Sequence, residues 1–434
     1  MGDMQGTDVE LDVTGIAHGG ISVARLDGRV VFVTDAIPGE RVLARITEDR
    51  KKSFWRADTV SVLEPSEFRQ PHVWEAASLD RDPSQRAGGA EFGHIRLSHQ
   101  RDLKRRVLVE ALQRMAGVEP EVVVEAVDGD DESGGTGYRT RIRLHVDPEG
   151  RVGPYAARSH SVVSVDHLPL ATAAIDLAAP LDQLFAGEEH IDLLEAADGG
   201  ARLIVGRQKR STIVERVGDR EFRLDDAGFW QIHRSAASTL TTAVQDLVDD
   251  DLFDPAAANL DLYGGVGLLA AALGDRFGSG TRITSVESDS RATAHASHNL
   301  REWSGAAAVT GRVERWIREL GRASGAGERA RLERATVVLD PPRSGAGREV
   351  VEAIAASSPA QVVYVACDPV ALARDVASFA ELGYGLRAVR AFDIFPNTHH
   401  VETVVRLTRE KRAEVDTITR WRSDSGPRST PTKG

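Results

Sequence analysis

The sequence predicts an α/β protein in which a parallel sheet with crossover helices follows two β-rich regions. After about residue 235, apolar strands such as ITSVES, ATVVLDPP and QVVYVACDP are separated by segments with helical spacing, which indicates crossover connections. Before that point, shorter segments alternate apolar and polar residues, as half-buried strands do. The length of 434 residues and the hydrophobic content of 41% allow two or three domains.

Residues 1–64 are predicted to form a small five-stranded barrel or meander. Five short alternating segments occur in this order: ELDVTGIA, GISVARL, RVVFVT, ERVLARIT and ADTVSVLE. They are separated by turn signals at His18-Gly19-Gly20, Asp27-Gly28 and Pro38-Gly39. We therefore assign this stretch to a first domain.

Residues 65–234 are predicted to form a mixed β-rich domain with a connecting helix. The helix is expected from about Ser98 to Met115, where apolar residues recur at helical spacing. From Tyr138 to about Leu224 the strand pattern returns in a longer and more broken form, with RTRIRLHVD, RLIVGR and TIVERV.

Residues 235–412 are predicted to form the α/β domain, and residues 413–434 a disordered tail. An amphipathic helix from Ser235 to Leu247 precedes the first strand, NLDLYGG, and the last two strands are expected at FDIFP and ETVVRLT. The tail is rich in Ser, Thr, Pro and Lys and has almost no apolar residues, so it cannot bury a core.

Charge and apolar runs restrict the partners of the chain. The net charge of -12 argues weakly against nucleic acid, because phosphate binding needs Lys and Arg. No run approaches the roughly 18 apolar residues of a membrane span, so we expect no membrane contact and a cytoplasmic location. Each basic cluster alone is typical of a solvated face, but four in the N-terminal half favour a polyanion. These clusters are Arg50, Lys51, Lys52 and Arg56; Arg101, Lys104, Arg105 and Arg106; Arg139, Arg141 and Arg143; and Arg207, Lys209 and Arg210.

A glycine turn after the first strand of the α/β domain indicates a nucleotide-like ligand. Asp261-Leu262-Tyr263 leads into Gly264-Gly265-Val266-Gly267, where glycines let the backbone approach a ligand closely. The second strand ends at Glu287, whose carboxylate could accept hydrogen bonds from ribose hydroxyls. This spacing fits NAD or S-adenosylmethionine. The third glycine of a pyrophosphate site is missing, which favours S-adenosylmethionine.

Three further residues at strand ends form a possible catalytic set. The fourth strand ends at Asp340, the fifth ends at Cys367, and Glu402 begins the last strand. Taken singly, Cys367 could equally be a packed small residue, and Glu402 is more often a solvated carboxylate. Together they fit methylation at carbon 5 of a uracil, which needs a thiolate at carbon 6 and a base for the carbon 5 proton. Because Cys367 is the only cysteine, a disulfide within the chain and cysteine-ligated metal sites are excluded.

In this order and spacing, DLYGGVG, LDPPRSGAG, VVYVACDPVALARD and FDIFPNTHHVETVV resemble the RNA 5-methyluridine methyltransferases that act on transfer and ribosomal RNA. Residues 8–64 resemble the TRAM domain, an RNA-binding barrel of many members. The resemblance implies a Rossmann-like methyltransferase domain, S-adenosylmethionine as cofactor and RNA as partner. It implies Cys367 as nucleophile and Glu402 as base. The implied cofactor contacts are Gln231, Tyr263, Gly265, Glu287 and Asp340, and the implied substrate contacts are Phe229 and Arg343.

The chain departs from the family pattern at several positions. Some members bind an iron–sulfur cluster through C-G-G-C and further cysteines, whereas this chain has Ala87-Gly88-Gly89-Ala90 and Leu168 before Pro169. We therefore expect no cluster and no metal. Asp368 replaces the usual Asn beside the nucleophile, and its charge could raise the thiol pKa or lower activity. Three milder departures are Gly264 for a common cysteine, His233 for a frequent Asn, and Arg312 near an expected polar cofactor contact.

Other functions remain possible at this stage. An amino-group methyltransferase would carry an aromatic residue where Arg343 follows Asp340-Pro341-Pro342, and an RNA cytosine-5 enzyme would carry a second cysteine. A methyltransferase for a different RNA base, or an RNA-binding protein with a weakened or inactive site, is also compatible with the barrel. We expect a monomer.

Overall fold

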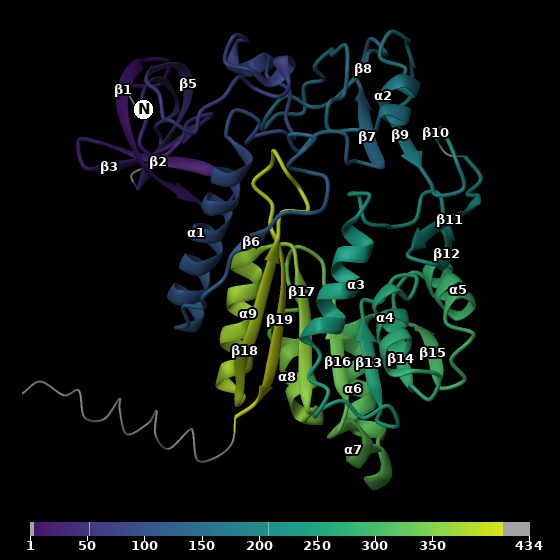
Figure 1. The fold of residues 1–434 in the computed structure, drawn as a ribbon. Coiled ribbons are helices and arrows are strands. Elements are labelled where there is room, and N and C mark those ends of the chain that lie inside the picture. Colours follow the sequence, from purple (N-terminus) through teal and green to yellow (C-terminus); the bar gives the residue numbers. More distant parts are fainter. Residues whose placement is uncertain (1–3, 52, 207, 411–434) are drawn as a thin grey trace, which may run out of the picture.

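The computed structural model describes residues 4–51, 53–206 and 208–410; the tail predicted at 413–434 lies outside these ranges. The described residues form a closed barrel, an eight-stranded sheet, a four-stranded sheet and a two-stranded sheet (Figure 1). No helix among them is long and apolar enough to span a membrane.

The N-terminal barrel has the strand order β1-β2-β3-β5-β4, and the five predicted strands are all confirmed. Each strand alternates buried and exposed side chains, and the buried ones, such as Leu11, Val31 and Ile46, fill the interior. The strands are β1 (Asp8–Ala17), β2 (Ile21–Leu26), β3 (Arg29–Thr34), β4 (Arg41–Glu48) and β5 (Phe54–Glu64).

The eight-stranded sheet has the order β15-β14-β13-β16-β17-β19-β18-β6. Strands β13 to β17 run parallel, and most of their buried residues are apolar, as expected for a sheet covered on both faces. The strands are β6 (Val124–Glu125), β13 (Asn259–Leu262), β14 (Ile283–Glu287), β15 (Ala306–Thr310), β16 (Thr336–Leu339), β17 (Gln361–Ala366), β18 (Tyr384–Phe392) and β19 (Glu402–Arg409).

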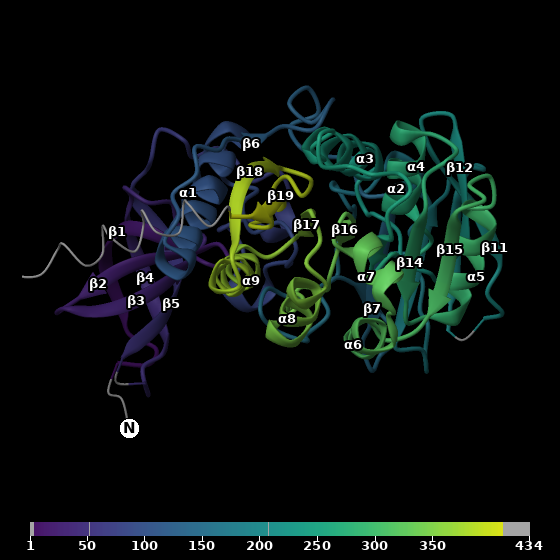
Figure 2. The same ribbon diagram turned by 90° about the horizontal axis from the view of Figure 1, so that it is seen from below.

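Helices cover both faces of this sheet (Figure 2). Alternate residues along a strand enter separate cores: Val337 and Leu339 pack with α1, α6, α8 and α9, whereas Val338 packs with α3 and α4. The helices are α1 (Leu97–Ala116), α3 (Ala236–Leu247), α4 (Leu268–Phe277), α5 (Ser290–Asn299), α6 (Val313–Ala323), α7 (Ala326–Leu332), α8 (Arg348–Ser357) and α9 (Pro369–Glu381).

Two features of the large sheet differ from the sequence prediction. The sheet is mixed, because β19 runs antiparallel to both β17 and β18. The segment FDIFP is not a strand of its own: β18 lies earlier and ends at Phe392, and the following residues form the loop that returns the chain to β19. This loop brings Glu402 beside the end of β17, because Ala366 pairs with Thr403.

The segment between the barrel and α3 joins several parts of the molecule. Helix α1 packs against α9, and β6 extends the large sheet beside β18. The four-stranded sheet encloses its own apolar core, and the hairpin β11–β12 packs on α5. The remaining elements are η1 (Glu75–Ala77), η2 (Pro83–Gln85), β7 (Arg141–Val146), β8 (Val152–Gly153), α2 (Ala173–Ala178), β9 (His190–Glu195), β10 (Ala201–Val205), β11 (Thr212–Val217) and β12 (Arg220–Asp225).

Candidate active site

A cavity of about 680 Å³ opens at the carboxyl ends of β13, β14, β16 and β17. Parallel sheets hold ligands at this edge, because the loops that follow neighbouring strands meet there. All nine site residues predicted from the sequence line this one cavity: Phe229, Gln231, Tyr263, Gly265, Glu287, Asp340, Arg343, Cys367 and Glu402. We call it the catalytic cavity.

The glycine turn has a backbone shape that few other residues could adopt. Tyr263 has a φ of 63° and Gly265 a φ of 53°, both in the left-handed region. At Gly264, a Cβ atom would lie 2.0 Å from the Ser285 hydroxyl oxygen and 2.5 Å from Asp261 Oδ2. While Ser285 keeps this position, residue 264 must be glycine. A cysteine at position 264 would force Ser285 to move.

Glu287 is fixed at the end of β14 by local hydrogen bonds. Its Oε2 accepts a bond from the Gly265 amide at 3.2 Å, and its Oε1 accepts bonds from the Asp289 amide at 2.8 Å and the Ser288 hydroxyl at 2.9 Å. Beside Gly265 itself, the position of a Cβ has no atom within 4 Å. The turn and the carboxylate thus form an open cradle that a ligand could enter.

Three buried carboxyl groups near this cradle have raised pKa values. Burial and the nearby Asp261 raise the pKa of Asp340 to about 7, and burial raises the pKa of Asp261 to about 6. Glu402 is 5% exposed, and burial together with Asp340 raises its pKa well above the ordinary value, while Arg343 opposes this. Carboxyls with raised pKa values can exchange protons near neutral pH, which suits acid–base chemistry.

The surroundings of Cys367 favour the neutral thiol over the thiolate. Burial and the negative charges of Glu402 and Asp340 raise the pKa of its thiol to about 12, and Arg343 lowers it. A thiolate would therefore form only when positive charge enters the cavity or a carboxylate takes the proton.

Asp368, the departure beside the nucleophile, has two structural partners. Its Oδ1 accepts hydrogen bonds from the amides of Val370 and Ala371 and so caps α9. Its Oδ2 lies 2.8 Å from Nε2 of His18, in the turn between β1 and β2 of the barrel. The carboxylate therefore links the barrel to the residue next to the nucleophile.

The segment that carries Phe229 and Gln231 is held in place by His233, two residues after Gln231. His233 is buried, and its Nε2 lies 3.1 Å from both carboxylate oxygens of Asp130. Its Nδ1 accepts a bond from the Ser235 amide at the start of α3. Phe229 by contrast is 73% exposed at the cavity, so its ring is available to a ligand.

Apolar side chains occupy three positions at which the family resemblance would place cluster cysteines. Ala87, Ala90 and Leu168 pack in one hydrophobic core with Trp74 and Tyr138. Within the described ranges, no group of three or more His, Cys, Asp or Glu residues could hold a metal ion.

Members of all four basic clusters form ion pairs. Lys51 and Arg56 pair with Glu48, and Arg210 pairs with Asp225. Arg101 and Lys104 both pair with Asp393, and Arg105 and Arg106 pair with Asp102. Arg141 pairs with Glu215 and Arg143 with Asp192. Lys52 and Arg207 lie outside the described residues.

Sequence reasoning missed several residues that shape the site. His18 was assigned only to a turn, and Ser285 and Asp261 were not singled out as the neighbours that exclude a side chain at position 264. His399 and His400 line the cavities around the thiol, with ring centroids 4.0 Å apart. Their position within the motif before Glu402 was the available signal.

Comparisons with known proteins agree with this arrangement. Residues 177–410 match the family model described as tRNA (uracil-5-)-methyltransferase, and residues 2–54 match the TRAM domain. An uncharacterized RNA methyltransferase of Streptomyces avermitilis is 35% identical over 93% of this chain and 98% of its own. An uncharacterized RNA methyltransferase of Bifidobacterium longum is 36% identical over 92% of this chain and 96% of its own.

A solved structure shares the fold along most of the chain. The tRNA (uracil-54, C5)-methyltransferase of Pyrococcus abyssi, in complex with S-adenosyl-L-homocysteine, aligns with a TM-score of 0.67 and 21% identity. The alignment covers 94% of this chain and 100% of that one. The fold, with its TRAM barrel, and the matched family model lead to one assignment: the chain belongs to the tRNA (uracil-5-)-methyltransferase family of RNA methyltransferases.

Proposed function

We propose that this protein methylates carbon 5 of a uridine in transfer or ribosomal RNA, with S-adenosylmethionine as methyl donor and Cys367 as covalent nucleophile. The observation that carries the proposal is the meeting of one thiol, one buried carboxyl and the glycine cradle in the catalytic cavity. The expected cytoplasmic location and monomeric state stay predictions.

The residues of the cavity fit S-adenosylmethionine. The open space beside Gly265 could receive the adenosine, with Glu287 at its ribose, and Tyr263 and Gln231 beside it. Asp340, with its raised pKa, would gain a cationic partner in the sulfonium. When bound, the cofactor supplies an electrophilic methyl group.

Cys367 and Glu402 then have separate tasks. With positive charge in the cavity, the Cys367 thiol loses its proton to solvent, so that Glu402 stays available as base, and the sulfur adds to carbon 6 of the uracil. Carbon 5 becomes nucleophilic and takes the methyl group. Glu402 then removes the carbon 5 proton, the carbon–sulfur bond breaks, and the double bond of the base is restored.

Arg343 and Phe229 are assigned to the substrate. Arg343 lowers the pKa of the Cys367 thiol, and its charge could also stabilise negative charge on the uracil oxygen during addition. The exposed ring of Phe229 could stack on a base that has been turned out of the RNA.

The test combines nucleoside mass spectrometry with a binding measurement. We expect wild-type protein to form 5-methyluridine in transfer or ribosomal RNA transcripts, and Cys367→Ala to form none while it binds S-adenosylmethionine normally in calorimetry. Near-normal turnover by Cys367→Ala would contradict the mechanism. Methylation by the wild type at another base or another atom would contradict the assigned substrate.

A further inference from the structure

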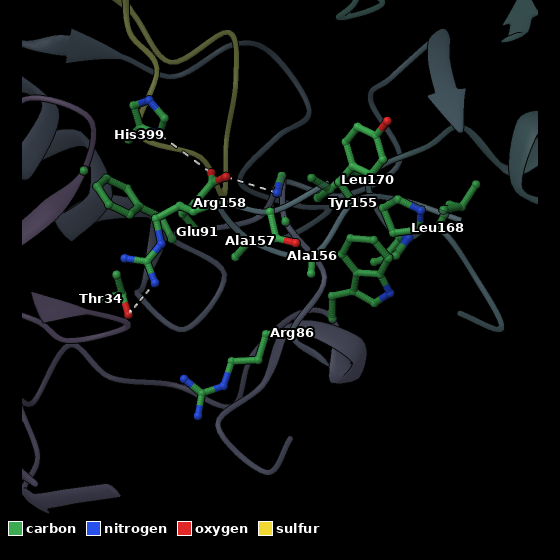
Figure 3. Close-up of a pocket in the computed structure, with 18 of the residues that line it drawn as sticks. Thr34, Arg86, Glu91, Tyr155, Ala156, Ala157, Arg158, Leu168, Leu170 and His399 are labelled. Carbon is green, nitrogen blue, oxygen red and sulfur yellow. Dashed lines mark hydrogen bonds and ion pairs between the residues drawn. The ribbon is translucent and has the colours of Figure 1, made fainter. Parts of the chain in front are cut away.

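A second cavity of about 580 Å³ lies between the barrel, the loop of residues 86–94 and strand β7 (Figure 3). None of the nine predicted site residues lines it. Its size is similar to that of the catalytic cavity and falls in the range of small-ligand sites.

The second cavity adjoins the catalytic cavity across two adjacent histidines. A small cavity of about 180 Å³ lies between them and is lined by Cys367, His399 and His400. His399 also lines the second cavity, and His400 also lines the catalytic cavity. A polymer with one residue at Cys367 could therefore place a nearby residue in the second cavity.

One wall of the second cavity is aromatic. The rings of His145 and Tyr155 are stacked with centroids 3.5 Å apart and an interplanar angle of 9°, and the ring of His160 meets Tyr155 edge-on at 5.2 Å. His145 and Tyr155 both line the cavity. Flat aromatic surfaces of this kind bind nucleobases of any sequence.

The polar groups of the wall have spare binding capacity. Arg139 donates hydrogen bonds to the Tyr138 hydroxyl at 3.3 Å and the Gly89 carbonyl at 3.4 Å, and it lies over the Tyr138 ring. The charge of Glu91 acts on it from the same cavity, but no ion pair to Arg139 is found within the described ranges. Two buried residues of the wall, Trp74 and His94, each have a side-chain nitrogen without a hydrogen-bond partner in that part of the chain. Buried polar atoms are normally paired, so these two nitrogens could bond a polar ligand that reached them.

Glu91 fixes the loop that separates the two cavities. Its carboxylate accepts a hydrogen bond from the Gly89 amide at 3.0 Å and lies 3.7 Å from Nδ1 of His399 (Figure 3). On the barrel side, Gly20 packs so closely on His399 that a Cβ atom would lie 2.4 Å from it. The boundary between the two cavities is thus formed by the barrel, the loop of residues 86–94 and the segment before β19.

We propose that the second cavity binds one further nucleotide of the RNA, close in sequence to the methylated uridine. Its base packs on the aromatic wall, and its phosphate or base oxygens lie near Arg139. This inference rests on the proposed function, because the RNA must first place its uridine at Cys367.

The test asks whether changes in the RNA and changes in the second cavity affect kcat/KM through the same contact. A short RNA that the wild type methylates is prepared with one abasic nucleotide at each position on either side of the uridine. We expect one such position to lower kcat/KM roughly tenfold, the value of one lost base–aromatic contact. Tyr155→Ala should lower kcat/KM by a similar factor with the intact RNA. When Tyr155→Ala acts on the abasic RNA, kcat/KM should fall no further.

Two other variants complete the design. Ala157→Leu adds bulk to the lining of the same cavity without removing an aromatic ring, and we expect the same loss. His190→Ala changes the strand partner of His145 outside the cavity and should leave kcat/KM unchanged. The affinity for S-adenosylmethionine should stay at the wild-type value in every variant, which checks folding.

The outcomes separate the two proposals. If the wild type methylates the RNA but no abasic position is coupled to Tyr155 or to Ala157→Leu, the second cavity does not bind a nucleotide. If the wild type methylates no uridine in RNA, the proposed function itself fails.

Discussion

The raised pKa of Asp340 predicts that S-adenosylmethionine binds more tightly as the pH rises from 6 to 8. Only the ionised carboxylate attracts the sulfonium, and with a pKa of about 7 it is present in about a tenth of the molecules at pH 6 and about nine tenths at pH 8. The dissociation constant should therefore fall roughly tenfold across this interval. The pKa of His400, lowered to about 3 mainly by burial, lies outside the interval. Asp261, with a pKa of about 6, titrates at its lower end, and the Asp340→Asn variant separates the two carboxyls.

Titration calorimetry in buffers of equal ionic strength measures this effect. S-adenosylhomocysteine, which lacks the positive charge on sulfur, is the matched control ligand and should show a much smaller change. Asp340→Asn should flatten the profile for S-adenosylmethionine. A flat profile for the wild type would refute the assignment of Asp340 to the sulfonium.

Two further predictions concern stability and RNA binding. Lys104→Met should lower the free energy of unfolding by about 1–3 kcal/mol in urea titrations, because Asp393 loses its buried partner and keeps, among the described residues, only Arg101 at 3.5 Å. Arg114→Met, which breaks an exposed pair on the same helix, should cost less than about 1 kcal/mol. Equal losses of unfolding free energy in Lys104→Met and Arg114→Met would contradict the assignment of Lys104 to a buried ion pair. Arg56→Ser, beside the Phe54 ring of the barrel, should weaken RNA binding and reduce the salt dependence by about one counterion in filter-binding assays, with S-adenosylmethionine affinity unchanged. If the salt dependence of RNA binding is unchanged in Arg56→Ser, the RNA does not contact the barrel at Arg56.

Some residues of the catalytic cavity could be predicted because they follow a recognisable strand, whereas Phe229 and Gln231, which lie between β12 and α3, came only from the family resemblance. Asp340 and Cys367 follow apolar runs, and parallel neighbours bring such positions to one edge. Glu402 was harder, since it begins its strand. It reaches the same edge only because β19 runs antiparallel to β17, which its apolar pattern does not reveal.

Contacts between distant segments could not be predicted from the sequence. His18 and Asp368 are separated by 350 positions, and neither local pattern nor composition indicates their contact. Strand β6 is only two residues long, so no periodicity marks it as the edge of the large sheet. The second cavity likewise depends on the packing of the barrel against residues far along the chain.

Capture of the covalent protein–RNA adduct tests the mechanism most directly. In Glu402→Gln, attack by Cys367 and methylation precede the blocked removal of the carbon 5 proton, so the adduct should accumulate. With a methylatable RNA and S-adenosylmethionine, we expect a slower band on denaturing gels whose mass equals protein, RNA and one methyl group, and none in Cys367→Ala/Glu402→Gln. Absence of the adduct in Glu402→Gln, or its persistence without Cys367, would contradict the roles assigned to these two residues.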